Sequence, residues 1–85
     1  MKEFEYIIKE SVGIHARPAN LLVREASSYK SNIMLYRNGD EANAKRLMSL
    51  MSLGVKYSEK VKFVIEGEDE ELVVEKLKIF CEQNL

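Results

Sequence analysis

Hydrophobic and polar positions in the first third of the chain predict a strand followed by a helix. Residues 4–9, "FEYIIK", carry apolar side chains at every second position from Phe4 to Ile8, which is the pattern of a strand with one buried face. From 16 to 29 the apolar positions follow helical spacing instead. Pro18 falls in the first turn, where its missing N–H has no intrahelical acceptor to lose. The apolar stripe of this helix consists of Ala19, Leu22, Val23, Ala26 and Tyr29.

A hairpin is expected next. Residues 32–37, "NIMLYR", predict a second strand, and Asn38-Gly39 predicts a type I′ turn because both residues tolerate positive φ. The return strand over 40–43 is short and poor in β-forming residues. We therefore expect it at an edge of the sheet.

The rest of the chain predicts a helix, a strand and a last helix. "RLMSLMSL" at 46–53 has the pattern of a short helix that Gly54 ends, and "KVKFVIE" at 60–66 alternates like a strand. Acidic residues from Asp69 onward begin the last helix, where the macrodipole favours negative charge. Its apolar stripe consists of Val73, Val74, Leu77, Phe80 and Cys81.

The predicted order is βαββαβα, within one domain over residues 1–85. A chain of 85 residues with 46% hydrophobic positions has enough apolar material for one core and too little for two. The hairpin, the short connections and the one-sided helices predict an α+β fold in which helices cover a single face of an antiparallel sheet.

Charge and cysteine content exclude several functions. The net charge of −1 argues against a nucleic-acid or membrane-surface binder that works by bulk electrostatics. The single cysteine, Cys81, excludes an intrachain disulfide and a thiolate-rich metal site, and we interpret it as a small core residue. The N-terminus is too charged for a signal peptide and no long apolar run exists, so we expect a reduced, cytoplasmic compartment without membrane insertion.

One short stretch, "SVGIHARPA" at 11–19, concentrates candidate chemistry. His15 falls at the cap of the first helix, where Ala16, Arg17 and Ala19 are expected to carry N–H groups without an intrahelical acceptor. Such a helix start binds anions, the Arg17 guanidinium suits phosphate oxygens, and a neutral imidazole is a competent nucleophile near pH 7. Residue chemistry alone therefore gives a phosphate-binding hypothesis.

The same chemistry leaves a plainer interpretation open, because a lone histidine near a helix start is more often a cap or a surface residue. A single histidine without a suitably spaced acid cannot build a metal site, and a Ser-His-Asp hydrolase has equally little support. We expect neither a metal nor a cofactor.

Two motifs in register resemble the histidine-containing phosphocarrier (HPr) family of the phosphoenolpyruvate-dependent sugar phosphotransferase system. They are "GIHARPA" at 13–19 and "MSLMSLGV" at 48–55, and the length and element order agree over the whole chain. The resemblance implies a two-layer open-faced β-sandwich with a four-stranded antiparallel sheet and three helices on one face. It also implies that His15 accepts a phosphoryl group on Nδ1 from phosphorylated enzyme I and donates it to IIA domains of sugar permeases. Arg17, with the backbone N–H groups of Ala16 and Arg17, would stabilise that group.

The resemblance further implies a docking face on the first two helices and no catalytic turnover of the protein's own. That face corresponds to Arg24, Leu47, Met48 and Met51. Flexible methionines suit a surface that fits several partners, although Met51 could equally fill the core. A basic rim would steer acidic partners, and it consists of Arg17, Arg24, Lys45, Arg46 and Lys56.

The chain departs from the family pattern at the regulatory serine that many members carry before the second helix. Arg46 occupies that position and has no hydroxyl to phosphorylate, so serine-linked regulation should not operate there. Its positive charge is the opposite of a phosphoserine's and should favour docking to acidic partners. Whether Ser49 or Ser52 takes over that regulation is left open.

Three alternatives remain beside a sugar phosphocarrier. One is an HPr-like paralogue of a nitrogen-branch or dihydroxyacetone-kinase phosphorelay. Another is a regulatory binding module, which the presence of His15 disfavours because members of that kind lack it. An RNA-recognition module shares the βαββαβ order, but the aromatic RNP motif is absent. A monomer is the simpler expectation for a carrier that exposes its site to successive partners.

Overall fold

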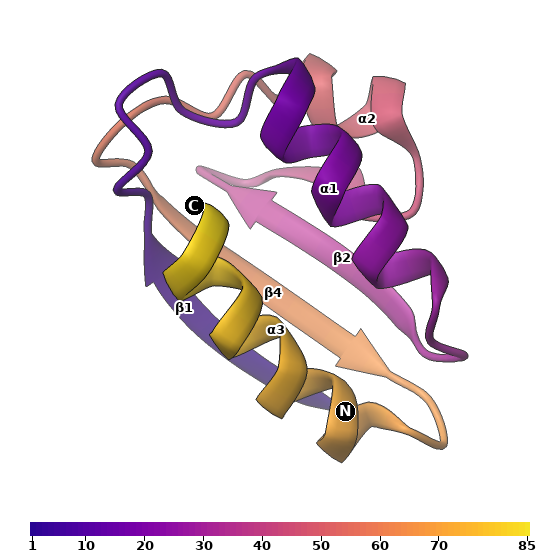
Figure 1. Cartoon of the computed structure of the whole chain (residues 1–85). Helices are drawn as coiled ribbons and strands as arrows, with labels where there is room; N and C mark the ends of the chain where they lie inside the picture. The colour runs from indigo at the N-terminus through magenta and orange to yellow at the C-terminus, as the bar shows by residue number, and fades with distance from the viewer.

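A computed structural model of the chain describes all residues from Met1 to Leu85. Four strands form one antiparallel sheet in the order β1-β4-β2-β3, and three helices cover one of its faces (Figure 1). The predicted open-faced α+β sandwich is therefore confirmed. Its elements in chain order are β1 (Lys2–Ile7), α1 (Ala16–Ser27), β2 (Asn32–Arg37), β3 (Asp40–Asn43), α2 (Leu47–Leu53), β4 (Lys60–Glu66) and α3 (Glu70–Asn84).

The core lies between the sheet and the helices because each strand alternates its side chains between the two faces. In β4, Val61, Phe63 and Ile65 are fully buried toward the helices, and Phe63 stacks on Phe4 of β1 with ring centroids 5.0 Å apart. The helices bury their predicted apolar stripes against this face. The opposite face is left open, so Lys60 and other polar side chains of the strands are exposed there.

The element boundaries differ from the sequence prediction mainly at β1. This strand ends at Ile7 rather than residue 9, and the backbone leaves the sheet after Ile8, whose N–H still donates to the Glu59 carbonyl at 3.0 Å just before β4. The N–H groups of Lys9 and Glu10 both donate to the terminal Leu85 oxygen, at 2.6 and 2.7 Å. Ile8 is nevertheless buried, as its place in the alternating pattern predicted.

The predicted hairpin is present. Asn38 (φ 51°) and Gly39 (φ 85°) both have positive φ, and Arg37 pairs with Asp40 across the turn. These are the conditions of a type I′ turn, which matches the twist of the flanking strands. The return strand β3 lies at the edge of the sheet, as expected.

Asp69, the N-cap residue of α3, ties the start of that helix to the segment before β2. Its carboxylate accepts the N–H groups of Lys30 at 2.9 Å and Ser31 at 3.0 Å, together with the hydroxyl of the buried Ser31. The Ser31 hydroxyl, followed by these N–H donors, lowers the pKa of Asp69. A group with a lowered folded-state pKa stabilises the fold above its unfolded pKa, and this contribution is lost as pH falls through the folded value.

We therefore predict that Asp69→Asn lowers the urea midpoint of unfolding at pH 7. The difference from wild type should shrink as the pH falls below about 3.9, the ordinary aspartate value, because protons then bind the carboxylate of the unfolded chain before they bind that of the folded protein. Urea titrations at pH 7 and pH 2.5 measure this, with Glu68→Gln as an exposed control. An equal difference at both pH values would contradict the assignment.

Candidate functional site

His15 is the N-cap residue of α1, and its imidazole makes no hydrogen bond. Its backbone is extended (φ −99°, ψ −169°), its N–H donates to the Gly13 carbonyl at 3.1 Å, and its carbonyl accepts the Ala19 N–H at 2.9 Å. The backbone of His15 is thus fixed on both sides, while the half-buried side chain has no partner. The ring nitrogens are left available to a reacting group.

Two backbone donors lie beside this imidazole. The N–H groups of Ala16 and Arg17 have no hydrogen-bond acceptor, because the residues four positions earlier lie outside the helix. The expectation for Ala19 was wrong, since its N–H reaches the carbonyl of the cap residue. The Arg17 side chain is exposed and forms no ion pair, so its guanidinium adds a free cation to the first turn.

The segment between α2 and β4 supports the loop that carries His15. The Ile14 N–H donates to the Val55 carbonyl at 3.0 Å, and Gly13 lies directly against the same segment. A Cβ on Gly13 would come within 2.4 Å of the Val55 oxygen and 2.8 Å of the Lys56 Cα. With φ at +77°, Gly13 is required both for the turn and for this close approach.

A shallow hollow of about 490 Å³ runs from the first turn of α1 along its exposed side. Its lining includes Arg17, Asn20 and Arg24, so two cations face it. Neither of these arginines has an acidic partner in the fold. The hollow therefore offers a positively charged surface next to His15.

The second helix, α2, lies beside α1 (Figure 1). Two of its methionine side chains are exposed. Met48 is 72% exposed and Met51 is 40% exposed, whereas Leu50 and Leu53 are buried in the core. The alternative that Met51 fills the core is therefore wrong. Leu47 is half-buried at the start of the helix, next to the exposed Met48.

Basic side chains border this apolar patch. Arg46 is the N-cap residue of α2, is exposed, and makes no capping or ionic contact with its side chain. Lys45 is more constrained, because its ammonium group donates to the Tyr29 carbonyl at 2.8 Å. The two helices thus present His15, both methionines and three unpaired arginines along one surface, which extends from the start of α1 to Arg24 in its last turn.

A family model described as the PTS HPr component phosphorylation site matches residues 2–83. The chain belongs to the HPr family. It is 42% identical to the phosphocarrier protein HPr of Mycoplasma genitalium, with 99% of this chain and 97% of that protein covered. A crystal structure of HPr from Thermoanaerobacter tengcongensis is also 42% identical and superimposes with a TM-score of 0.93, covering 99% of this chain and 94% of that one.

The chain is also similar, at lower identity, to the HPr-like protein Crh of Bacillus subtilis. Its crystal structure, described as a dimer with a swapping domain, is 35% identical and has a TM-score of 0.77, with 100% of this chain and 98% of that chain covered. HPr proteins are phosphocarriers of the phosphotransferase system. No helix of this HPr chain combines the length and the apolar character needed to cross a bilayer.

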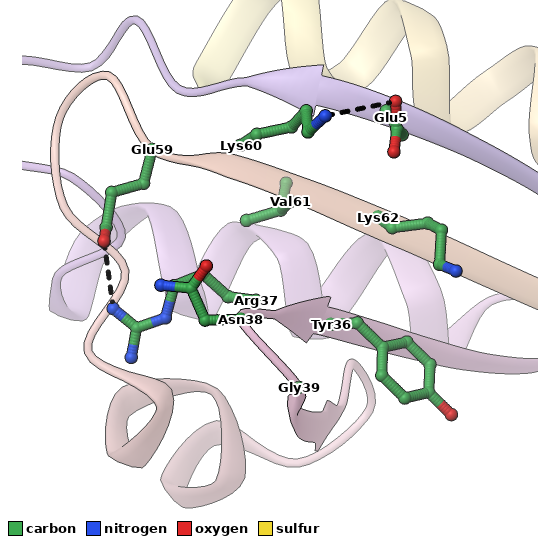
Figure 2. Close-up of a pocket in the computed structure, with 9 residues that line it drawn as sticks. All are labelled: Glu5, Tyr36, Arg37, Asn38, Gly39, Glu59, Lys60, Val61 and Lys62. Carbon is green, nitrogen blue, oxygen red and sulfur yellow. Dashed lines mark hydrogen bonds and ion pairs between the residues drawn. The ribbon is translucent and has the colours of Figure 1, made fainter.

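Sequence reasoning missed one polar cluster of this HPr fold. Arg37 and Glu59 form an ion pair beside a hollow of about 400 Å³ at the β2–β3 turn, on whose other wall Lys60 pairs with Glu5 (Figure 2). The hollow holds none of the predicted site residues. No local pattern could have paired Arg37 with Glu59, because they lie 22 residues apart on different segments.

Proposed function

We propose that this chain carries a phosphoryl group on His15, which accepts it from phosphorylated enzyme I and donates it to IIA domains of sugar permeases. The observation that carries the proposal is the imidazole of His15, which has no partner and lies beside two free N–H groups at a helix start. Membership of the HPr family supports the same role.

In the proposed reaction the unprotonated ring nitrogen, Nδ1 by analogy with the family, attacks the phosphorus atom. An N–P bond forms while the bond from phosphorus to the donor breaks, and its electron pair leaves with the donor. The other ring nitrogen keeps its proton throughout. The Ala16 and Arg17 N–H groups and the Arg17 guanidinium offset the negative charge of the phosphoryl oxygens.

The exposure of this site suits a carrier rather than an enzyme with its own turnover. The phosphoryl group would be held by donors that face solvent, so it is not buried in a deep trap that would oppose onward transfer. The patch of Met48 and Met51 next to the site would give successive partners an adaptable apolar contact. We propose docking through this patch and through Arg24 and Leu47.

Charge reversal at Arg46 should slow partner association. We predict that Arg46→Glu raises the KM for phosphorylation by enzyme I about fivefold at low salt and leaves kcat unchanged, because rim charges act mainly on association. The effect should fade near 0.5 M salt, where exposed charges are screened. Steady-state phosphotransfer rates measure both values.

The matched control is Lys62→Glu, which makes the same change in net charge on the open face of the sheet, opposite the helices, where Lys62 pairs with Glu3. Equal effects of the two reversals would show that overall charge, and not local contact at Arg46, governs the rate.

Intact-mass spectrometry tests the carrier function itself. The protein is incubated with phosphoenolpyruvate and with an enzyme I that phosphorylates another HPr. We expect a gain of one phosphoryl group that is lost in acid and stable in base, as for a phosphohistidine. No gain would reject the proposal and favour an HPr-like paralogue or a regulatory module.

Oligomeric state is part of the same proposal, since a monomer exposes His15 to both partners. Light scattering on a sizing column should give one mass near 9.8 kDa. A stable mass twice as large would instead favour a dimer such as the one described for Crh.

A further inference from the structure

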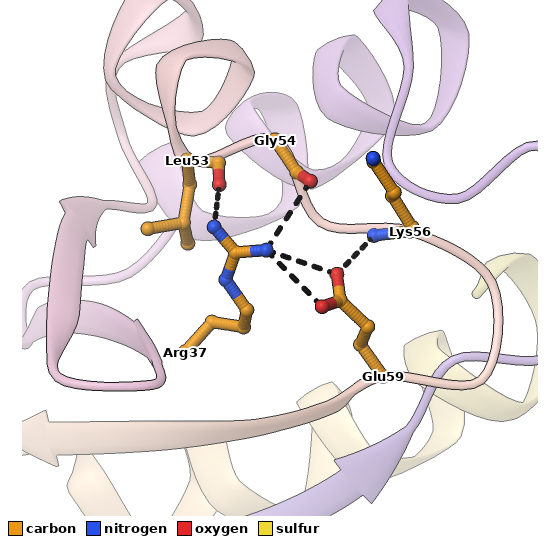
Figure 3. A network of polar contacts seen from close by, with 5 residues as sticks. All are labelled: Arg37, Leu53, Gly54, Lys56 and Glu59. Atoms are coloured by element: carbon orange, nitrogen blue, oxygen red, sulfur yellow. Dashed lines mark hydrogen bonds and ion pairs between the residues drawn. The ribbon is translucent and has the colours of Figure 1, made fainter.

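The Arg37–Glu59 ion pair closes the segment between α2 and β4 (Figure 3). Nη1 of Arg37 donates to both carboxylate oxygens of Glu59, at 3.0 and 3.2 Å. Its Nη2 donates to the Leu53 carbonyl at 2.6 Å, and Nη1 also reaches the Gly54 carbonyl at 3.5 Å. One guanidinium at the end of β2 thus holds both the C-terminus of α2 and the carboxylate before β4.

Glu59 extends this network to the middle of the segment. Its Oε1 accepts the Lys56 N–H at 2.7 Å, and its own N–H donates to the Lys56 carbonyl at 3.2 Å. The Lys56 N–H is the largest cause of the lowered pKa of Glu59, with the Arg37 hydrogen bond adding to it. The Glu59 carboxylate is therefore charged at neutral pH. Together with the bond from Arg37 to Leu53, its hydrogen bonds fix the segment on both sides of Val55.

That segment is the one that supports the His15 loop. The Val55 carbonyl accepts the Ile14 N–H at 3.0 Å, and Gly13 lies against Val55 and Lys56 with no room for a side chain. The His15 N–H in turn donates to the Gly13 carbonyl. A continuous path of hydrogen bonds and contacts therefore runs from Arg37 to His15, although neither charged residue touches the imidazole.

This pair differs from the other ion pairs of the chain. The Arg37 side chain is 19% exposed and that of Glu59 is 29% exposed, whereas every other pair has at least one partner that is more than 40% exposed. Arg37 Nε is moreover buried without an acceptor. Partly buried charges need partners and good geometry to be tolerated, so removing either residue leaves the other uncompensated.

We propose that Arg37 and Glu59 are positioning residues for phosphoryl transfer at His15. They fix the segment 53–59, which contacts the loop that carries His15. The position and orientation of that loop relative to α2 therefore depend on this segment. The inference rests on the proposed carrier function of His15. Lysine could not replace Arg37 fully, because a single ammonium cannot bind the Leu53 carbonyl and the Glu59 carboxylate in the same forked geometry.

The test compares Arg37→Met, Glu59→Gln, the double variant and Arg37→Lys with wild type. Glu68→Gln is the matched control, because it neutralises a glutamate of the exposed Lys30–Glu68 pair beyond the far end of β4. Phosphorylation by enzyme I is followed over carrier concentration to separate kcat from KM. Amide hydrogen exchange by NMR compares Ile14, which lies on the path, with Phe63 in the core.

We expect kcat to fall about tenfold in Arg37→Met and in Glu59→Gln, because small displacements of a reacting group cost rate steeply. KM should stay within about twofold, since Met48 and Met51 are not part of the network. The Ile14 amide should exchange about tenfold faster, and by a larger factor than the Phe63 amide, which reports only the loss of global stability. Arg37→Lys should recover part of the loss, and the double variant should cost less than the product of the single effects.

Two failures are distinguishable. If wild type and Glu68→Gln gain no phosphoryl group, the carrier function itself is refuted. If both are phosphorylated and the Arg37 and Glu59 variants match them in kcat, the positioning role is overturned. The positioning role is also overturned if the Ile14 and Phe63 amides exchange faster by equal factors, because that pattern reports a general loss of stability. Should Arg37→Met fail to fold, Arg37→Lys and Glu59→Gln decide the question.

Discussion

Replacing His15 with alanine is expected to abolish phosphoryl uptake and leave the fold intact. The imidazole makes no capping bond, so α1 loses no side-chain hydrogen bond in the variant. The backbone bonds of residue 15 to Gly13 and Ala19 do not depend on its side chain. The free energy of unfolding should therefore change by less than about 0.5 kcal/mol, while the mass gain with enzyme I disappears.

The reason for so complete a loss is that the site holds no second nucleophile. Around the helix start, the neighbouring side chains are two arginines, an amide and apolar groups, none of which forms a phosphoryl intermediate. Thermal unfolding followed by circular dichroism verifies the fold, and Glu68→Gln, in an exposed ion pair with Lys30, serves as a variant that keeps His15. A full mass gain in His15→Ala, stable in acid, would move the modification to a hydroxyl such as that of Ser49 or Ser52.

The order and faces of the elements were predictable because they depend on local periodicity. Val61, Phe63 and Ile65 are buried as their alternation predicted, and Asn38-Gly39 forms its turn through the conformational freedom of those two residues alone. The free N–H groups next to His15 were predictable for the same reason, since the start of any helix leaves its own N–H groups without acceptors. Boundaries shifted where a distant group decided them, as the Leu85 oxygen does at the end of β1.

The contacts that support the His15 loop could not be predicted, because they join residues that are distant in the sequence. Gly13 lies two residues before His15, and nothing in its sequence neighbourhood indicated that the Val55 carbonyl would lie against it. Arg37 has the sequence context of an ordinary exposed strand end, yet its guanidinium holds the segment that contacts Gly13. Periodicity predicts which face of an element is buried, but it carries no information on which polar groups meet across the fold.

Replacing Gly13 with alanine should therefore damage both stability and transfer. The positive φ costs an L-residue about 1–2 kcal/mol, and forcing a methyl group into a packed contact adds about 1–3 kcal/mol. Because the obstructing atoms are the backbone of Val55 and Lys56, they cannot turn aside as a side chain would. We expect a total loss of roughly 2–5 kcal/mol in the free energy of unfolding.

Gly39→Ala separates the two causes. Gly39 has nearly the same φ, +85°, but a Cβ there would meet nothing within 4 Å. Its replacement should cost only the backbone strain, about 1–2 kcal/mol, and should leave phosphorylation of His15 unchanged. In Gly13→Ala the loop must move away from Val55, so the Ile14 hydrogen bond weakens and kcat with enzyme I falls about tenfold or more. Urea unfolding and phosphotransfer rates of both variants measure this difference, and equal losses in the two would mean that strain alone, without the contact to Val55, explains Gly13.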